Sequence, residues 1–105
     1  MEGIKYDQDK LRFDLMPPNA EEAVADVLTY GATKYAPNNW KKLDNLEERY
    51  IAAALRHINA HRKGEPDDPE SGRLHLAHAI CGLMFIIESW YPDDDSSTLA
   101  TSPVA

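Results

Sequence analysis

Apolar residues recur at helical spacing in three stretches of the chain. In the first stretch they follow the i, i+3, i+4 rhythm of an amphipathic helix over about residues 20–34. Asn19 and Glu22 have the spacing of a capping box, in which two side chains satisfy free N–H groups at a helix start. The apolar positions of this predicted helix are Ala20, Val24, Val27, Leu28 and Gly31.

The second stretch predicts a helix over about residues 45–63. Asp44 and Glu47 offer another capping box at its start. Gly64 is the type of residue that ends a helix, because glycine adopts the left-handed conformation without a steric penalty. We expect one stripe of this helix to be buried. That stripe consists of Tyr50, Ile51, Ala54, Leu55 and Ile58.

The third stretch predicts a helix over about residues 69–90, with Asp68 as its N-cap and Pro69 at its first position. This helix is apolar on more than one side. One stripe is Leu74, Cys81 and Phe85, and the other is Leu76, Ile80, Leu83 and Ile87. A helix that is apolar around most of its circumference must be central in its fold or buried between subunits.

The remaining segments show no periodicity. We expect residues 1–16 to form an extended arm and residues 92–105 an acidic and polar, disordered tail. Residues 1–91 then form a single helical nucleotide-binding domain. Three helices of about 55 residues in total bury only a modest core. The expected fold is therefore all-α, a small bundle of about three main helices with an extended N-terminal arm, completed by homo-oligomerisation through the last helix.

The net charge and the cysteine content limit the binding partners and the cellular compartment that we expect. The 105 residues carry 11 Lys and Arg against 18 Asp and Glu, a formal charge of −7. This balance argues against DNA, RNA and anionic membranes as partners, but a single nucleotide needs only a few local cations. Cys81 is the only cysteine, and no signal peptide is evident at the N-terminus. We therefore expect a reducing, cytoplasmic setting.

All four histidines lie between residues 57 and 78, in two pairs with carboxylates between them. His57 and His61 are spaced i, i+4, and His75 and His78 are spaced i, i+3, so each pair shares a face of a helix. A short Gly/Pro/Asp connection predicts an antiparallel hairpin that brings the pairs together. A rise of about 1.5 Å per residue then puts His57 and His75 at similar heights. The alternative is that these are solvated polar residues beside a turn.

Two further segments carry residues suited to a nucleotide. Lys34 can neutralise a phosphate, and Tyr35 or Trp40 can stack on a base, with Asn39 beside them. Arg56 lies next to an apolar stripe and needs an anionic partner, either a carboxylate of the chain or a ligand phosphate. The alternative for the first segment is a lysine at a helix C-terminus and aromatic residues covering the core.

The acidic connection between the second and third predicted helices, residues 65–70, has two possible roles. Asp68 and Glu70 can simply cap the last helix. They can also bind Mg²⁺ or Mn²⁺ through oxygen, with His75 and His78 as nitrogen ligands suited to manganese. Structural zinc does not fit, because the chain has a single cysteine that is remote from these residues.

A series of short motifs in a fixed order is similar to a known family. The motifs are Lys5-Tyr6-Asp7, Leu15-Met16-Pro17-Pro18, VLTYGATKY at 27–35, Asn39-Trp40, Leu55-Arg56-His57, Asp68-Pro69-Glu70-Ser71-Gly72 and His75-Leu76-Ala77-His78-Ala79. Over about residues 5–88 they resemble the phage dATP/dGTP diphosphohydrolase N-terminal domain family. The resemblance implies a phage-encoded helical homo-oligomer, related in activity to the MazG-type nucleotide pyrophosphohydrolases. Those enzymes use Mg²⁺ or Mn²⁺ to cleave a (d)NTP between its α and β phosphates, and their core helices carry ExxE and ExxD motifs.

These observations lead to one main hypothesis. It is an intracellular enzyme that cleaves a purine deoxynucleoside triphosphate to the monophosphate and pyrophosphate. Its catalytic residues are His57, Asp68 and Glu70. Its metal ligands are Asp68, Glu70, His75 and His78. Its substrate-binding residues are Lys34, Tyr35, Asn39, Trp40, Arg56 and His57.

The alternative hypothesis is a non-catalytic phage protein that sequesters a nucleotide, such as a cyclic immune signal. The same cations, histidines and aromatic residues would serve it, but no metal would be essential. In place of the acidic motifs of the MazG-type enzymes, the predicted hairpin carries Arg56-His57, His75 and His78.

Overall fold

The computed structural model describes residues 3–92. The elements of secondary structure named in this part of the chain are all helices, so the fold is all-α. The three main helices are α1 (Pro18–Lys34), α2 (Leu46–Arg62) and α3 (His75–Ser89). Two short 3₁₀ turns precede α1 and α2: η1 (Phe13–Leu15) and η2 (Asn39–Lys42). The three predicted helices and the all-α fold are confirmed. The predicted tail, from residue 93 onward, lies outside the described residues.

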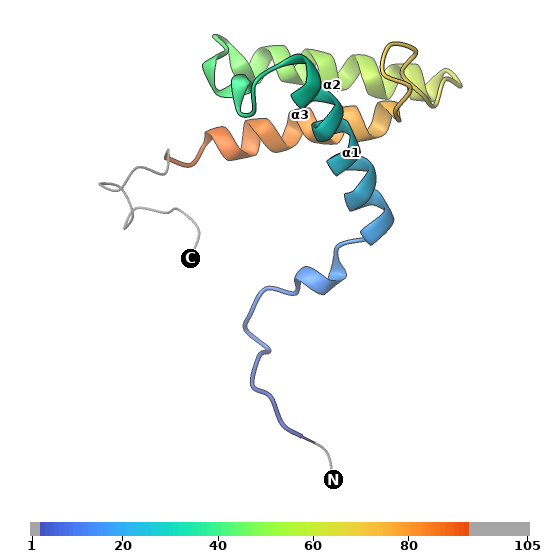
Figure 1. Cartoon of the computed structure of the whole chain (residues 1–105). Coiled ribbons are helices and arrows are strands. Elements are labelled where there is room, and N and C mark those ends of the chain that lie inside the picture. Colours follow the sequence, from blue (N-terminus) through green and yellow to red (C-terminus); the bar gives the residue numbers. More distant parts are fainter. Residues whose placement is uncertain (1–2, 93–105) are drawn as a thin grey trace.

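Helices α2 and α3 lie side by side as a hairpin, and α1 packs across α3 (Figure 1). The contact between α1 and α3 is built from small and β-branched side chains. Val24 and Val27 of α1 pack against Ala77 and Cys81 of α3. The Cys81 thiol lies 3.5 Å from the carbonyl oxygen of Val24, because small residues let the two backbones approach closely. Burial raises the pKa of this thiol to about 11.

The helix starts differ from those predicted. Helix α1 begins at Pro18, because the fixed φ of proline suits the first helical position and its missing N–H is not needed there. Asn19 is therefore inside the first turn and does not cap it. Helix α2 begins at Leu46 after Asn45, which has a left-handed backbone, and no side chain caps this start. The predicted capping boxes at both starts were wrong.

The start of α3 is the largest departure from prediction. The helix begins at His75, six residues later than Pro69. The intervening segment instead closes on itself: the Asp68 N–H donates to the Arg73 carbonyl (2.8 Å), and the Gly72 N–H to that of Asp68 (2.7 Å). An isolated antiparallel bridge pairs Asp67 with Leu74. Asp68 therefore stabilises a tight turn and does not cap α3.

The predicted buried stripe of α2 is only partly buried. Ala54 is buried and Tyr50 and Ile58 are half-buried, but Ile51 is 41% exposed and Leu55 60% exposed. The reason is that α2 packs mainly on one helix, α3, so its outer half faces solvent. One stripe of α3 is also exposed: Leu76, Ile80, Leu83 and Ile87, with Met84 beside it.

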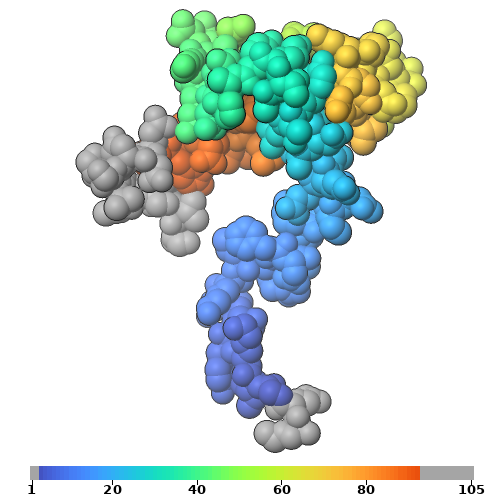
Figure 2. All heavy atoms as spheres, viewed as in Figure 1, coloured from blue at the N-terminus to red at the C-terminus, as the bar shows by residue number. Residues whose placement is uncertain are grey.

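The segment before α1 extends away from the helices, as predicted for an arm (Figure 2). It carries exposed apolar side chains, among them Tyr6, Leu11 and Phe13. The radius of gyration is 17.2 Å, against about 13 Å for a compact domain of 100 residues. Among the residues that the structure describes, no helix has the length and apolar character needed to cross a bilayer.

Candidate functional site at the hairpin turn

The end of α2 positions the first acidic side chain of the connection. Gly64 has a φ of +98°, which glycine adopts without strain. The Gly64 N–H donates to the His61 carbonyl and the Glu65 N–H to the Ala60 carbonyl, both at 3.0 Å. This pair of bonds is a Schellman motif, and the predicted glycine end of the helix is confirmed. The motif reverses the chain, so that Glu65 comes to lie against α3.

The closed turn that follows presents Asp68 and Ser71. The Asp68 carboxylate accepts a hydrogen bond from the Ser71 N–H at 3.3 Å. Arg73 ties the turn to α1: its side chain donates to the Ser71 carbonyl (2.8 Å) and to Asp26 (3.3 Å), and it lies over the ring of Tyr30. The turn is thereby fixed at both ends, and Ser71 is buried.

Three of the four imidazoles converge beside this turn. The Nδ1 atoms of His57 and His75 are 2.8 Å apart, which confirms that the two residues lie at similar heights. The rings of His57 and His78 are stacked, with centroids 4.8 Å apart and planes 11° apart. His61, in contrast, lies on the exposed side of α2 and outside the cluster. The i, i+4 pairing of His57 with His61 therefore has no role in it.

Each end of the cluster meets an acid or a hydroxyl. Nε2 of His75 is 2.7 Å from a Glu65 carboxylate oxygen, and the His75 side chain is almost completely buried. Nε2 of His78 lies 2.7 Å from the Ser71 hydroxyl oxygen and 3.7 Å from Asp68. The cluster is thus a continuous polar network within a small helical core.

Burial favours the uncharged form of two of these imidazoles, His57 and His78. Burial lowers the pKa of His57, and the neighbouring His78 and His75 lower it further. Burial also lowers the pKa of His78, against the opposing effect of Asp68. For Asp68, burial alone would raise the pKa, but hydrogen bonds from Ser71 and the charge of His78 outweigh it and lower the pKa.

Lys34 reaches the hairpin turn from the end of α1. Its ammonium group is 3.1 Å from the Glu70 carboxylate, although 36 positions separate the two residues. The same group lies 5.7 Å from the ring centre of Tyr30 and 5.6 Å from that of Tyr35. The predicted cation and one predicted aromatic residue therefore do lie together beside the turn.

The other predicted substrate-binding residues, Asn39, Trp40 and Arg56, lie outside the histidine cluster. Trp40 stacks on Phe85, with ring centroids 4.8 Å apart. Phe85 follows His78 by seven residues in α3, a distance of about 10 Å along the helix. Asn39 is half-buried next to Trp40. Arg56 is exposed on α2, beside His57 in sequence. These residues do not join the histidine cluster in this structure.

The four predicted metal ligands are not arranged around one point. Glu70 pairs with Lys34, and both ring nitrogens of His75 are occupied by His57 and Glu65. Asp68 and His78 remain as neighbours. Within residues 3–92, no three His, Cys, Asp or Glu side chains come together as a metal-holding group. The donor set as arranged therefore does not fit a metal held by this chain alone.

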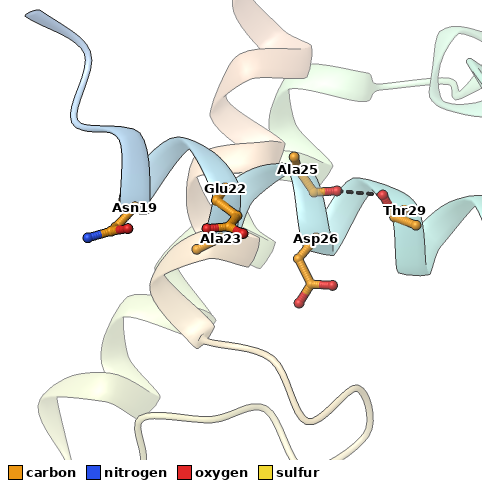
Figure 3. Close-up of a pocket in the computed structure, with 6 residues that line it drawn as sticks. All are labelled: Asn19, Glu22, Ala23, Ala25, Asp26 and Thr29. Carbon is orange, nitrogen blue, oxygen red and sulfur yellow. Dashed lines mark hydrogen bonds between the residues drawn. The ribbon is translucent and has the colours of Figure 1, made fainter.

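Two hollows on the described surface lie elsewhere. A shallow depression of about 480 Å³ follows the exposed side of α1, where Asn19, Glu22, Ala23, Ala25, Asp26 and Thr29 line it (Figure 3). Glu22 and Asp26 give it a negative charge, which repels phosphate groups. A smaller hollow of about 280 Å³ lies near Trp40 and Tyr91. Neither hollow contains a histidine, so we place the candidate site at the polar cluster.

The contacts of Glu65 and Arg73 were not predicted from the sequence. A signal for Glu65 was present, because a residue directly after the terminal glycine of a helix is held in a fixed place by the Schellman motif. For Arg73 no local signal exists, since its partner Asp26 is 47 positions away.

Comparison with known proteins places the chain in a family. Residues 1–95 match the family described as "dATP/dGTP diphosphohydrolase, N-terminal". A relative from Salmonella phage PMBT28, named dATP/dGTP diphosphohydrolase, is 44% identical over 86 residues, which cover 82% of this chain. The match spans only 29% of the length of that relative. No solved structure matches the chain. The chain belongs to the dATP/dGTP diphosphohydrolase N-terminal family.

Proposed function

We propose that this chain binds a purine deoxynucleoside triphosphate, dGTP or dATP, and takes part in its cleavage to the monophosphate and pyrophosphate. The observation that carries the proposal is the cluster of His57, His75 and His78 with Glu65 and Asp68 at the hairpin turn. Imidazoles that are uncharged near neutral pH are suited to accept a proton from an attacking water. The family name of the phage relative supports the class of substrate.

The proposed catalytic residues are His57, Asp68 and Glu70. In this proposal His57 orients the attacking water, and Asp68 and Glu70 act from the hairpin turn. Lys34 and Arg56 neutralise the phosphates, and for Lys34 this requires release of its exposed pair with Glu70. Both side chains of this pair are exposed to solvent, and such surface pairs contribute little to stability, so a triphosphate can displace the carboxylate.

The base is proposed to contact Tyr35, Asn39 and Trp40. A nucleoside triphosphate is an elongated ligand, so its base and its phosphates can occupy different parts of the surface. Tyr35 is exposed beside Lys34 and is the nearest aromatic side chain for stacking.

A divalent metal, Mg²⁺ or Mn²⁺, is part of the proposal for the working enzyme. Asp68 and His78 are the predicted ligands that stand together, whereas Glu70 and His75 are engaged by other side chains. Phosphate oxygens of the nucleotide would have to complete the coordination. Such a metal would supply charge neutralisation of the phosphates.

The test is incubation of the chain with dGTP and Mn²⁺, with pyrophosphate release as the readout. We expect release in the wild type, loss of release in Asp68→Asn, and no change in Asp67→Asn. Asp67 is the matched control because it is the neighbouring, exposed acid. Binding of dGTP in the presence of EDTA, with no release under any metal condition, would contradict the enzyme.

That contrary result would support a second candidate function, a phage protein that sequesters a nucleotide. The observation that favours it is that two of the acids at the turn are already paired, Glu70 with Lys34 and Glu65 with His75. A site of this kind can hold an anion without a metal.

We also propose that the chain works as a homo-oligomer through α3. The exposed stripe of Leu76, Ile80, Leu83 and Ile87 supports this, because a contiguous apolar face on a small domain is typical of an interface. We also propose that the protein acts in the host cytoplasm, on the nucleotides present there.

A further inference from the structure

Two cations from different parts of the fold lie against the ring of Tyr30. The ammonium group of Lys34, in the last turn of α1, is 5.7 Å from the ring centre. The guanidinium of Arg73, in the hairpin turn just before α3, is 4.8 Å from the same centre. Both distances are within the range of cation–π contacts. Because they share one ring, the two cations cannot be farther apart than the sum of these distances.

Each of the two cations is paired with one carboxylate. Lys34 is 3.1 Å from Glu70, and Nε of Arg73 is 3.3 Å from Asp26. The side chains of Glu70 and Asp26 are 72% and 53% exposed, so water competes with both ion pairs. The four charges balance in the free chain. Both pairs are of the weak surface kind that a ligand of higher negative charge can replace.

Arg73 has hydrogen-bond donors beyond those that its present partners use. A guanidinium carries five N–H groups. One of them donates to Asp26, and one on Nη1 donates to the Ser71 carbonyl at 2.8 Å. The bond to Ser71 holds the side chain at the turn when Asp26 is released. Since 35% of the Arg73 side chain is exposed, its remaining donors can contact a ligand.

We propose that Arg73 is a second phosphate-binding residue beside Lys34, and that Asp26 and Glu70 occupy in the free chain the places that phosphate oxygens take. This inference rests on the proposed function and adds to it Arg73 and the exchange of both carboxylates. The ligand group is the triphosphate, because its adjoining phosphates offer anionic oxygens to two separate cations. A planar guanidinium can bind two phosphate oxygens at once, which an ammonium group cannot do.

The surroundings of Asp26 provide a matched control. Asp26 and Glu22, which are one helical turn apart in α1, line the same hollow (Figure 3). A carboxylate released from Arg73 is therefore hydrated there. Within residues 3–92, the ion pair of Arg73 is with Asp26 and not with Glu22. Only Asp26 competes directly with a phosphate for Arg73.

The primary experiment is calorimetric titration of the full chain with inorganic tripolyphosphate in the presence of EDTA, so that neither metal nor cleavage contributes. Asp26→Asn should bind roughly two- to fivefold more tightly than the wild type, because the competing carboxylate is gone. Glu22→Gln makes the same change of charge in the same hollow and should leave the affinity nearly unchanged.

The cation itself is tested in the same titration. Arg73→Gln should bind tripolyphosphate about tenfold more weakly, because it removes a charge-assisted contact with phosphate. Arg49→Gln is the control for loss of one positive charge. Arg49 is exposed in the first turn of α2, at the opposite end of that helix from the hairpin turn, so its removal should not change the affinity.

A purely structural role for Arg73 predicts a different result for Asp26→Asn. If Arg73 only ties the turn to α1, loss of its partner loosens the turn and does not tighten binding. Unchanged or weaker binding by Asp26→Asn, an equal gain in Glu22→Gln, or no binding by the wild type would overturn the inference. This comparison does not depend on how well Arg73→Gln folds.

Pyrophosphate release from dGTP separates this inference from the proposed function. Tighter binding of tripolyphosphate by Asp26→Asn, without release by the wild type under any metal condition, would count against the proposed cleavage alone. Release by the wild type, with equal tripolyphosphate affinity in the wild type, Asp26→Asn and Arg73→Gln, would count against the role of Arg73 alone.

Discussion

Three imidazoles in contact constrain one another's charge. His57 touches both His75 and His78, and two neighbouring imidazolium ions at this distance repel each other. Partial burial adds to this effect at His57 and His78, because it lowers the pKa of both rings. The hydrogen-bonded partners of the cluster are the rings of His57 and His75 for each other, Glu65 for His75 and Ser71 for His78.

Protonation of these rings should destabilise the fold. The pKa values of His57 and His78 are lowered in the folded chain by burial, so the unfolded chain binds protons first as the pH falls. Stability should therefore be full above the ordinary imidazole pKa, about 6.5, and decline as the pH falls below it. Asp68, whose pKa is also lowered, should extend the loss at more acidic pH.

The measurement is urea unfolding at pH 7.5 and 5.5. We expect the free energy of unfolding to fall between these values, and to fall less in His78→Gln, which has no titrating ring. His61→Asn is the control, because His61 is exposed and outside the cluster. A wild-type stability that rises on acidification would show that the rings are charged in the folded chain.

At the scale of elements, the hairpin turn is the part that organises the site. The Schellman motif at Gly64 sets the direction in which the chain leaves α2, and the bonds among Asp68, Ser71 and Gly72 set where α3 begins. Arg73 then joins this connection to α1. Glu65 can meet His75 only because both motifs form.

Two glycines, one directly after the end of α2 and one within α1, should respond in opposite ways to alanine. Gly64 has a left-handed φ, so Gly64→Ala should lower the free energy of unfolding by about 1 kcal/mol. Gly31 lies within α1, and a Cβ there would meet nothing within 4 Å. Gly31→Ala should therefore raise the free energy of unfolding by about 0.5–1 kcal/mol.

Thermal unfolding of the two variants measures this contrast. Equal stability of the two variants would mean that the turn at Gly64 does not depend on its left-handed backbone.

At the scale of the whole molecule, few large side chains are buried among residues 3–92. Its buried apolar residues are mostly small: Val24, Val27, Ala54, Ala77, Ala79, Cys81 and Ile86. Helix α3 contacts both other helices, yet one stripe of it remains exposed. In the proposed homo-oligomer, this uncovered apolar face of α3 would be buried against another copy.

The oligomer can be tested by a matched pair of substitutions. Ile80 on α3 is 42% exposed and Ile51 on α2 is 41% exposed. Ile80→Asp should convert the assembly to monomers, because it places a charge in the proposed interface, and Ile51→Asp should leave the assembly intact. Light scattering coupled to size-exclusion chromatography gives the mass of each. A monomeric wild type, or dissociation by Ile51→Asp, would contradict an interface on α3.

The number and approximate location of the helices, and the meeting of His57 with His75, could be predicted from the sequence, because both depend on local periodicity. The spacing of apolar residues gave three helices and the all-α class, and Gly64 marked the end of α2. Histidine spacing and a short connection were enough to bring His57 beside His75. These features need only the geometry of a helix and the length of a turn.

Only the tertiary structure determined which residues the charged and polar side chains contact. Asp68-Pro69 has the composition of a helix start, but the bonds of the closed turn delay α3 until His75. Lys34 meets Glu70 and Arg73 meets Asp26 across 36 and 47 positions, and no local pattern specifies such pairs. The assignment of both His75 nitrogens likewise required the positions of Glu65 and His57. Contacts between distant residues depend on how the helices pack, whereas a single helix is specified by the residues of its own few turns.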